Sequence, residues 1–378
     1  MACYRLGDIC TIISGSTPKT EVAEYWDGGF KWITPAELND DSYIIEDSAR
    51  KLTALGVQKT GLTPFPAGTI ILSSRAPIGK VAIAGCEMYC NQGFKNLICS
   101  EIVHNKYLFW YLKGKTEYLN SLGRGATFKE ISKQIVGGIE IELPPMEEQI
   151  AIARRFEQLN LLLHKRKQEI TMLDQLIKAR FVEMFGDPIA NEKGWKTKPL
   201  LSMGACKNGM NFHYDDSGVE LNCLGVGDFK DYSIISDTAA LPMVSLNEMP
   251  SSEYLLQDDD IVFVRSNGNK KMVGRSIAVY PGNIPTTFSG FCIRYRRMDN
   301  SVITPYLLRV FKAESMRQKM YGRGANIQNL NQQTLSSLDI PIPPKEMQEQ
   351  FAAFVTQVDK SKVVDLSVFT NRAKSYII

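Results

Sequence analysis

The sequence lacks long apolar runs and metal-binding patterns, and each absence excludes a class of protein. No run of about 18 apolar residues occurs, so we expect no membrane-spanning helix. The first residues contain no apolar signal core, which favours a cytoplasmic protein. The 8 cysteines and 3 histidines form neither a C-x-x-C pair nor a zinc-ligand spacing. We therefore expect reduced cysteines and no structural metal.

Motifs for nucleotide chemistry are missing as well. The two proline pairs follow Leu143 and Ile342, so neither belongs to an Asn-Pro-Pro-Tyr/Phe methyltransferase motif. Gly79-Lys80 is followed by Val81 and has no glycine five residues before it, so it is not a phosphate-binding loop. Residues 225–227 (Gly-Val-Gly) continue as Asp-Phe-Lys, which excludes a dinucleotide fingerprint. These absences predict a binding protein without catalytic residues or a cofactor of its own.

What the sequence does contain is an internal repeat with a spacing of 199 residues, from Gly123 to Gly322. The segments related by this spacing are Gly-Arg-Gly-Ala at 123–126 and 322–325, Pro-Pro at 144–145 and 343–344, and Gln149 and Gln348. Solenoid repeats have periods of roughly 20–50 residues, so this spacing indicates a duplicated domain instead. A chain of 378 residues is long enough for two domains with separate cores.

A heptad pattern of apolar residues predicts a long helix over residues 144–186. The residues of this seam are Ile152, Phe156, Leu159, Leu163, Ile170, Leu173, Ile177 and Met184, with Arg166 and Arg180 in the two gaps. The proline pair precedes the helix, and Gly186 is placed to end it. Such a helix would be roughly 60 Å long. Its apolar stripe is expected to need a partner helix.

The repeat places that partner at residues 343–378. Its seam is expected to contain Phe351, Val355 and Val358. Lys362 and Asp365 interrupt the pattern further on, and β-branched residues follow, so the second helix is expected to be shorter or altered. Residues 1–143 and 187–342 then form two similar α+β domains. In each, a strand-like run (68–75 and 260–267) leads into a turn, and a helix is expected later, over 106–122 and 304–321.

Charge is distributed unevenly within each half of the sequence. Residues 265–323 carry 12 basic and 2 acidic side chains, whereas residues 187–264 are mainly acidic. Residues 75–134, with 9 basic and 4 acidic side chains, repeat the pattern weakly after the acidic residues 1–74. Clustered lysine and arginine are expected of a surface that binds a polyanion such as DNA. The alternative is that acidic and basic segments pair inside each domain.

Taken together, these features resemble the specificity subunit of type I restriction-modification systems. The resemblance covers nearly the whole chain and rests on the duplication and on short motifs. The motifs are Ile-Glu-Leu-Pro-Pro-Met-Glu-Glu-Gln at 141–149, Ile-Pro-Ile-Pro-Pro-Lys-Glu-Met-Gln at 340–348, Tyr-Arg-Leu-Gly-Asp-Ile at 4–9, Ser-Gly-Ser-Thr-Pro at 14–18 and Phe-Val-Glu-Met-Phe-Gly-Asp-Pro at 181–188.

The resemblance implies two target-recognition domains separated by a pair of long antiparallel helices. Each domain would read one half of a bipartite, asymmetric double-stranded DNA site, and the helices would set the spacer. Two modification subunits, which bind S-adenosylmethionine and methylate adenine, and ATP- and Mg²⁺-dependent restriction subunits would assemble on this chain. A protein-interaction scaffold without DNA readout is the main alternative, and an enzyme with an unrecognised site is another.

Polar and basic residues near the turns are the candidate DNA contacts. In the second domain they are Arg265, Ser266, Asn267, Asn269, Lys270, Lys271 and Arg275. In the first they are Ser73, Ser74, Arg75, Lys80, Gln92, Lys95 and Asn96, with Lys19 and Lys31 near Trp26 and Trp32. Arginine pairs with guanine and asparagine with adenine, so Arg265 and Asn267 are the preferred base readers. An ordinary solvated loop is the alternative, and the two tryptophans are expected to pack rather than to stack on bases.

The repeated Gly-Arg-Gly loops are expected to act independently of sequence, because both domains share them. Arg124 and Lys129 lie in the first loop, and Arg323, Asn326 and Gln328 lie in the second. We assign the two arginines to phosphate contacts, with a structural role at the end of the preceding helix as the alternative.

Overall fold

The computed structural model describes residues 2–75, 77–125, 129–212, 217–229, 234–321 and 329–362. Within these residues the chain divides into two compact units, and the first gives way to the second between Lys167 and Gln168. That boundary lies inside the longest helix, α6 (Met146–Phe185), so each unit contains one domain and the part of α6 that packs on it. No helix of the described segments is long and apolar enough to cross a membrane.

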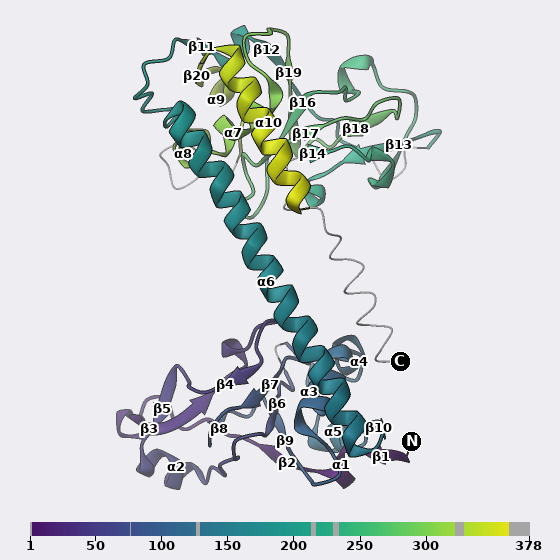
Figure 1. Ribbon diagram of the computed structural model, residues 1–378. Coiled ribbons are helices and arrows are strands. Elements are labelled where there is room, and N and C mark those ends of the chain that lie inside the picture. The colour runs from purple at the N-terminus through teal and green to yellow at the C-terminus, as the bar shows by residue number, and fades with distance from the viewer. Residues whose placement is uncertain are drawn as a thin grey trace. The chain divides into compact units, whose positions relative to one another are not determined.

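The first domain contains three small sheets (Figure 1). The strand orders are β2-β9-β6-β7-β4 in the largest sheet, β5-β3-β8 in the second, and β1-β10 in the third. Their bounds are β1 Ala2–Arg5, β2 Cys10–Ser14, β3 Trp26–Ile33, β4 Ile44–Ile45, β5 Arg50–Leu52, β6 Ile70–Leu72, β7 Val81–Ala84, β8 Tyr89–Cys90, β9 Lys95–Cys99 and β10 Glu140–Leu143.

The second domain repeats this arrangement strand for strand. Its orders are β12-β19-β16-β17-β14, β15-β13-β18 and β11-β20. The bounds are β11 Thr197–Pro199, β12 Gly204–Asn208, β13 Val219–Leu224, β14 Ile234–Ile235, β15 Met243–Leu246, β16 Asp260–Val264, β17 Ser276–Val279, β18 Thr286–Phe288, β19 Cys292–Arg297 and β20 Asp339–Pro341. The directions repeat too: β4–β7 and β3–β8 are parallel, as are β14–β17 and β13–β18. The predicted α+β fold with an internal duplication is confirmed.

Short helices and turns complete the two domains. In the first they are α1 Leu6–Ile9, η1 Ala23–Tyr25, η2 Pro35–Glu37, α2 Ala54–Thr60, α3 Asn105–Gly114, α4 Thr116–Ser121 and α5 Lys133–Gly137. In the second they are η3 Leu200–Ser202, η4 Val226–Asp228, η5 Thr238–Ala240, η6 Ser252–Tyr254, α7 Thr304–Lys312, α8 Glu314–Tyr321 and α9 Gln332–Ser336. The longer helix α10 spans Lys345–Lys362.

The helices expected over 106–122 and 304–321 are each broken into two. Helix α3 ends before Lys115 (ψ 18°), and α7 ends before Ala313, which is extended with ψ 135°. The break redirects the chain, so that Leu119 of α4 and Met316 of α8 are fully buried in their domain cores. The expectation of one continuous helix was wrong in both domains, because the backbone leaves the helical conformation at Lys115 and at Ala313.

The predicted seam of α6 is the less exposed side of the helix. Buried or half-buried along it are Ile152, Phe156, Leu159, Leu163, Ile170, Leu173, Ile177 and Met184. Near the end the seam departs from the prediction, because Phe181 is 4% exposed whereas Arg180 is exposed and pairs with Glu183 at 2.8 Å. The step from Ile177 is four residues rather than three, as a helix of 3.6 residues per turn allows. Arg180 therefore lies outside the seam.

At the start of α6 the seam packs on its own domain. The ring of Phe156 stacks on Trp110 of α3 with ring centroids 5.6 Å apart. Beside it, the carboxylate of Glu157 in α6 forms an ion pair with the ammonium of Lys106, at 2.6 Å. The expectation that the whole seam needs a partner helix was wrong here, because the domain itself covers this apolar face.

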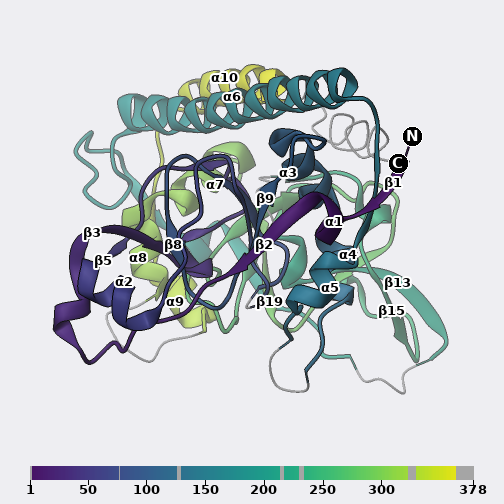
Figure 2. The same ribbon diagram turned by 90° about the horizontal axis from the view of Figure 1, so that it is seen from below.

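Toward its end α6 packs against α10. Phe351 of α10 lies 5.5 Å from Phe181 and 5.6 Å from Phe185, measured between ring centroids. Further along α10, Lys362 pairs with Asp174 at 2.6 Å. Because later residues of α10 meet earlier residues of α6, the two helices are antiparallel over this stretch, and they run side by side in both views (Figure 1 and Figure 2).

The seam residues of α10 were predicted correctly over its described length. Phe351 is fully buried, Val358 is 8% exposed and Val355 is half-buried. Helix α10 is described to Lys362, so the predicted alteration of residues 363–378 lies outside the described residues.

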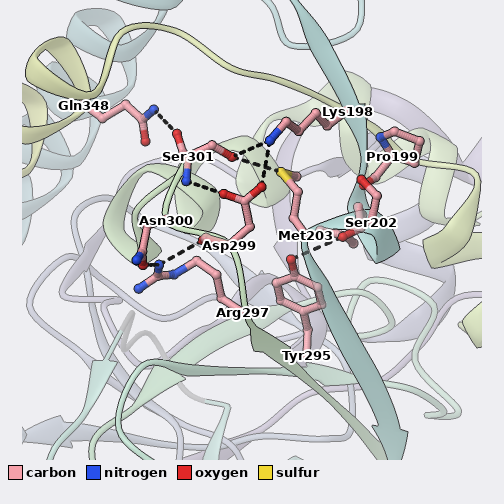
Figure 3. Close-up of polar contacts among 11 residues, drawn as sticks. Lys198, Pro199, Ser202, Met203, Tyr295, Arg297, Asp299, Asn300, Ser301 and Gln348 are labelled. Atoms are coloured by element: carbon pink, nitrogen blue, oxygen red, sulfur yellow. Dashed lines mark hydrogen bonds and ion pairs between the residues drawn. The ribbon is translucent and has the colours of Figure 1, made fainter.

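A polar network joins α10 to the second domain (Figure 3). Gln348 donates to the carbonyl of Ser301 at 2.9 Å, and Asp299 accepts a bond from the Ser301 amide at 2.5 Å. Lys198 of β11 binds the same carboxylate at 2.7 Å. The lysine ammonium and the Ser301 amide lower the pKa of Asp299 to about 2. The network links the edge strand, the loop after β19 and the start of the helix.

Candidate nucleic-acid interface

The ends of β6 and β16 are equivalent positions in the two domains, as backbone hydrogen bonds show. Ser74 donates to the Gly93 carbonyl and accepts from the Ile131 amide, at 2.8 and 3.0 Å. Arg265 likewise donates to the Phe291 carbonyl at 2.8 Å and accepts from Leu330 at 2.7 Å. Leu330 is the counterpart of Ile131 in the internal repeat. Ser74 and Arg265 are therefore equivalent positions. An alignment of the runs 68–75 and 260–267 by their first residues is shifted by one residue from this structural equivalence.

The loop after this position is four residues longer in the second domain. It returns to the sheet at Gly79 in the first domain and at Gly274 in the second, with φ of 89° and 72°. Each glycine donates to the last residue of the preceding run, Ser73 or Val264, at 3.0 and 2.8 Å. The loops are thus residues 74–78 and 265–273, which we call the short loop and the long loop. A positive φ favours glycine at both return points.

Asparagine side chains shape the long loop internally. Asn267 accepts from the Asn269 amide at 2.8 Å, and Asn269 accepts from the Lys271 amide at 3.0 Å. Arg265 is half-buried and donates to the Gly290 carbonyl at 3.1 Å. Asn269, Lys270 and Lys271 are exposed, whereas Ser266 and Asn267 are half-buried. The predicted base readers and the flanking lysines are therefore brought together on one loop.

In the first domain the basic candidates gather around a carboxylate that the sequence did not single out. Glu130 lies 3.1 Å from the ammonium of Lys95 and 4.0 Å from the guanidinium of Arg75. The backbone of Glu130 also pairs with Arg124 through two hydrogen bonds of 3.0 Å. In the second domain Asn329 takes the place of Glu130 and forms a β-bridge to Ser266. Only the spacing of the internal repeat connects these two positions in the sequence.

Four candidate DNA contacts in the first domain are buried, so their side chains are not accessible to DNA. Ser73, Ser74 and Asn96 are 0% exposed, and Lys95 is 7% exposed. The Ser73 hydroxyl donates to the Pro77 carbonyl at 2.7 Å. Lys95 donates to the Ser74 hydroxyl at 3.3 Å, so Ser73, Ser74 and Lys95 stabilise the base of the short loop, whereas Asn96 donates to Cys90 Sγ at 3.1 Å.

Lys80 and Arg275 were predicted to contact DNA, but each binds a backbone carbonyl at an equivalent place inside its own domain. They follow the two return glycines, and each donates to the carbonyl of the residue after a 3₁₀ turn, Leu38 for Lys80 and Phe229 for Arg275. At the start of each turn a carboxylate accepts a backbone hydrogen bond of 2.8 Å. Glu37 accepts from the Thr34 N–H at η2, and Asp228 accepts from the Gly225 N–H at η4. A contact repeated in both domains indicates a role in holding the fold.

Of the two candidate lysines near the tryptophans, one has a partner inside the domain and the other is exposed. Lys31 donates to the Glu46 carbonyl at 2.6 Å, whereas the side chain of Lys19 is exposed. Trp26 and Trp32 are buried and meet edge to face at 5.1 Å. The expectation that the tryptophans pack rather than stack on bases is confirmed.

Besides Lys19, the exposed candidates of the first domain are Gln92, Arg124 and Lys129. The hydroxyl of Thr17 donates to the Gln92 amide oxygen. Arg124 combines an anchored backbone with an exposed side chain, which agrees with both roles considered for it. The corresponding residues Arg323, Asn326 and Gln328 lie outside the described residues.

Part of the charge asymmetry in the second domain is neutralised internally. Asp260 is 1% exposed and is held by Arg296 at 2.7 Å, with Arg294 at 3.9 Å. Arg297 of the same basic segment lies 3.8 Å from Asp259 of the acidic segment. The alternative of pairing within the domain therefore holds for these residues. The long loop contributes two exposed lysines, Lys270 and Lys271, to the basic region of this domain.

The described residues contain neither a metal-ligand cluster nor a disulfide. No group of three or more His, Cys, Asp or Glu side chains in the described part of the chain is arranged to hold a metal ion. All eight cysteines are free. Burial raises the pKa of Cys206 and of Cys223 to about 12, so neither thiol is a ready nucleophile.

Comparison with known proteins identifies the architecture. The family model for the type I restriction modification DNA specificity domain matches residues 1–172 and 228–365. The type I restriction enzyme MjaIX specificity subunit of Methanocaldococcus jannaschii is 36% identical over 225 residues, which cover 55% of this chain and 52% of that protein. This chain therefore aligns with about half the length of that relative.

Two further comparisons extend over more of the chain. The MjaVIII specificity subunit of the same organism is 22% identical and covers 94% of this chain and 85% of that protein. The crystal structure of a type I restriction-modification S subunit from M. genitalium has the same fold, with a TM-score of 0.54 at 16% identity, and covers 100% of this chain and 94% of that one. The chain belongs to the family of type I restriction-modification DNA specificity domains.

Proposed function

We propose that this chain is the DNA specificity subunit of a type I restriction-modification complex. Each domain binds one half of a bipartite, asymmetric double-stranded DNA site, and the helices α6 and α10 set the spacer. The observation that carries the proposal is that two domains of one fold differ in their surface loops. The short and long loops leave equivalent strand ends but present different side chains, as two readers of different sequences require.

Partner subunits supply the chemistry in this proposal. The specificity-subunit family is non-catalytic. We assign adenine methylation to two modification subunits that bind S-adenosylmethionine, and cleavage to restriction subunits that use ATP and Mg²⁺. The exposed apolar side chains of α6, such as Leu162 and Leu176, at 51% and 49%, fit a helix that is covered in an assembly.

The proposal is tested by expressing the chain with its modification subunit and mapping N6-methyladenine in the host DNA by single-molecule sequencing. We expect one methylated motif with two parts and a fixed gap. Methylation without a two-part motif, or complex formation without salt-dependent DNA binding, would favour the scaffold alternative.

A substitution in the long loop tests whether this loop reads one half of the methylated DNA motif. Arg265→Ala should relax one half-site only, whereas Arg180→Ala, on the exposed side of α6, should leave the motif unchanged. Equal loss of methylation on every sequence in the Arg265 variant would contradict base reading by that residue.

A further inference from the structure

Phe291 is an exposed aromatic residue at a rigid place in the second domain. It lies in the turn between β18 and β19 and is 60% exposed, although Gly290 and Cys292 on either side are buried. An exposed phenyl ring forgoes the favourable free energy of burying apolar surface. Single exposed apolar side chains are common, so exposure alone decides nothing. The position of this ring is what distinguishes it.

The backbone of Phe291 is fastened to the start of the long loop. Its carbonyl accepts from the Arg265 amide at 2.8 Å and from the Ser266 amide at 3.2 Å. The guanidinium of Arg265 donates to the neighbouring Gly290 carbonyl at 3.1 Å. The ring is therefore carried on the same surface as the proposed base readers, and on a backbone that is held in place.

The first domain presents different chemistry at the same point of the same backbone. Gly93 accepts from the Ser74 amide as Phe291 accepts from Arg265, so Gly93 and Phe291 are equivalent. The residue before Gly93 is the exposed Gln92. One domain thus offers an amide followed by glycine, and the other offers glycine followed by a phenyl ring. The two domains share the same backbone at this point but carry different side chains. We expect this of a position that reads bases.

The chemistry of the two side chains indicates what each would read. The glutamine amide can donate to and accept from adenine in the major groove. A phenyl ring has no hydrogen bond to offer, and the base faces of a duplex are stacked against one another. The apolar group that the major groove presents is the C5-methyl group of thymine, with which phenylalanine makes favourable contacts.

We propose that Phe291 is a specificity-determining residue that contacts a thymine methyl group in the half-site of the second domain. This inference rests on the proposed function, because it requires that the surface around the long loop faces DNA. It adds a thymine to the expected half-site at a position next to the base contacted by Arg265.

The test replaces each thymine of the second half-site by deoxyuridine, which lacks the methyl group, and measures binding by the assembled complex. One replacement should weaken binding of the unchanged protein roughly fourfold, the factor for burying one methyl-sized group. Phe291→Ala should bind more weakly and should not respond to that replacement, and Phe291→Leu should respond partly. This double-mutant comparison isolates the contact between ring and methyl group.

Controls make the outcomes distinguishable. Met298→Ala changes a 73% exposed residue just after β19 and should leave the response to deoxyuridine unchanged. Melting temperatures check that each variant folds. Equal responses of the unchanged protein and Phe291→Ala, or equal weakening on every duplex, would overturn the inference while leaving the bipartite site intact. A complex that selects no bipartite site would overturn the proposed function instead.

Discussion

Gln149 and Gln348 are counterparts in the internal repeat and make the same three hydrogen bonds, each in its own domain. Both side chains are buried, at 1% and 0% exposure. The amide oxygen of Gln149 accepts from the His104 backbone N–H at 2.8 Å. Its amide nitrogen donates to the carbonyls of Ile102 and Pro144, both at 3.0 Å.

Gln348 reproduces these contacts with the repeat counterparts of those residues. It accepts from the Ile303 N–H at 3.0 Å and donates to the carbonyls of Ser301 and Pro343 at 2.9 Å each. Each glutamine satisfies one backbone donor and two backbone acceptors, and its bond to the proline carbonyl is buried. It joins the loop after the last long strand of a domain to the proline pair that precedes a long helix. The glutamine in the repeated motif is therefore the residue that fixes the helix to its domain.

Replacing either glutamine by alanine should destabilise the corresponding unit. Gln348→Ala leaves the buried Pro343 carbonyl and two partly buried backbone groups without this partner, and a buried group left so costs about 1–3 kcal/mol. The free energy of unfolding, measured by urea titration, should fall by at least that amount. Gln357 lies on the exposed side of the same helix, and Gln357→Ala should change it by less than about 0.5 kcal/mol. Equal effects of the two substitutions would contradict the role of Gln348.

The end of the α6 seam makes a second prediction. Phe181→Ala removes a ring that packs on Phe351 and Tyr306, at 5.5 and 5.8 Å between centroids, and should cost about 3–5 kcal/mol. Arg180→Ala, one residue earlier, should cost less than about 1 kcal/mol, because its ion pair with Glu183 is exposed. Thermal unfolding distinguishes the two. A larger loss for Arg180 would restore the heptad register that the sequence suggested.

Much of the fold followed from patterns with clear physical causes. The heptad spacing of apolar residues predicted the extent of α6, and Gly186, with φ of 78°, ends it as expected. The constant offset between the repeated motifs predicted the duplication. The predicted seam was wrong at Phe181, where a heptad repeat and a period of 3.6 residues select different positions. Over a short stretch both periods fit the apolar residues equally well.

The candidate site was predicted less completely, because side-chain partners come from distant segments. Lys80 and Arg275 looked like free cations, but each binds a carbonyl that lies far away in the sequence. Glu130 was missed since only the fold brings it to Arg75 and Lys95. Charge counts along the sequence do not tell which cations are already paired.

The carboxylate of Asp299 should make stability depend on pH. Its pKa is lowered to about 2 by the Lys198 ammonium and the Ser301 amide, below the ordinary value of 3.8. A lowered pKa of an acid stabilises the folded state above the unfolded pKa, and that contribution is lost as pH falls from about 4 to about 2. Asp299→Asn should therefore melt at a lower temperature than the unchanged protein at pH 7, with a difference that shrinks below pH 4.

Lys198→Met provides the matched control for this pH dependence. It removes the main cause of the shift, so adding Asp299→Asn to it should have less effect than adding it to the unchanged protein. A melting difference that stays constant from pH 7 to pH 2 would show that the carboxylate charge is not what stabilises this network.

Glu130 should restrain DNA binding by the first domain. Its carboxylate partly neutralises Arg75 and Lys95, and its backbone lies beside Arg124, whose side chain is exposed. Glu130→Gln removes a negative charge while keeping an oxygen that can accept from Lys95. In the proposed function, the complex should then bind every duplex a few-fold more tightly at low salt, the effect of about 1 kcal/mol expected for one charge near the surface.

The salt dependence and a control substitution separate this effect from base reading. The gain of Glu130→Gln should shrink as salt rises, because screening weakens charge interactions at a surface. Glu140→Gln, in an exposed pair with Arg5 at 3.9 Å, is the control and should change affinity little. Weaker binding of one half-site in Glu130→Gln would instead mean that the carboxylate accepts a hydrogen bond from a base, as cytosine can donate. In that case Glu130 would be a reader of the first half-site rather than a restraint on its affinity.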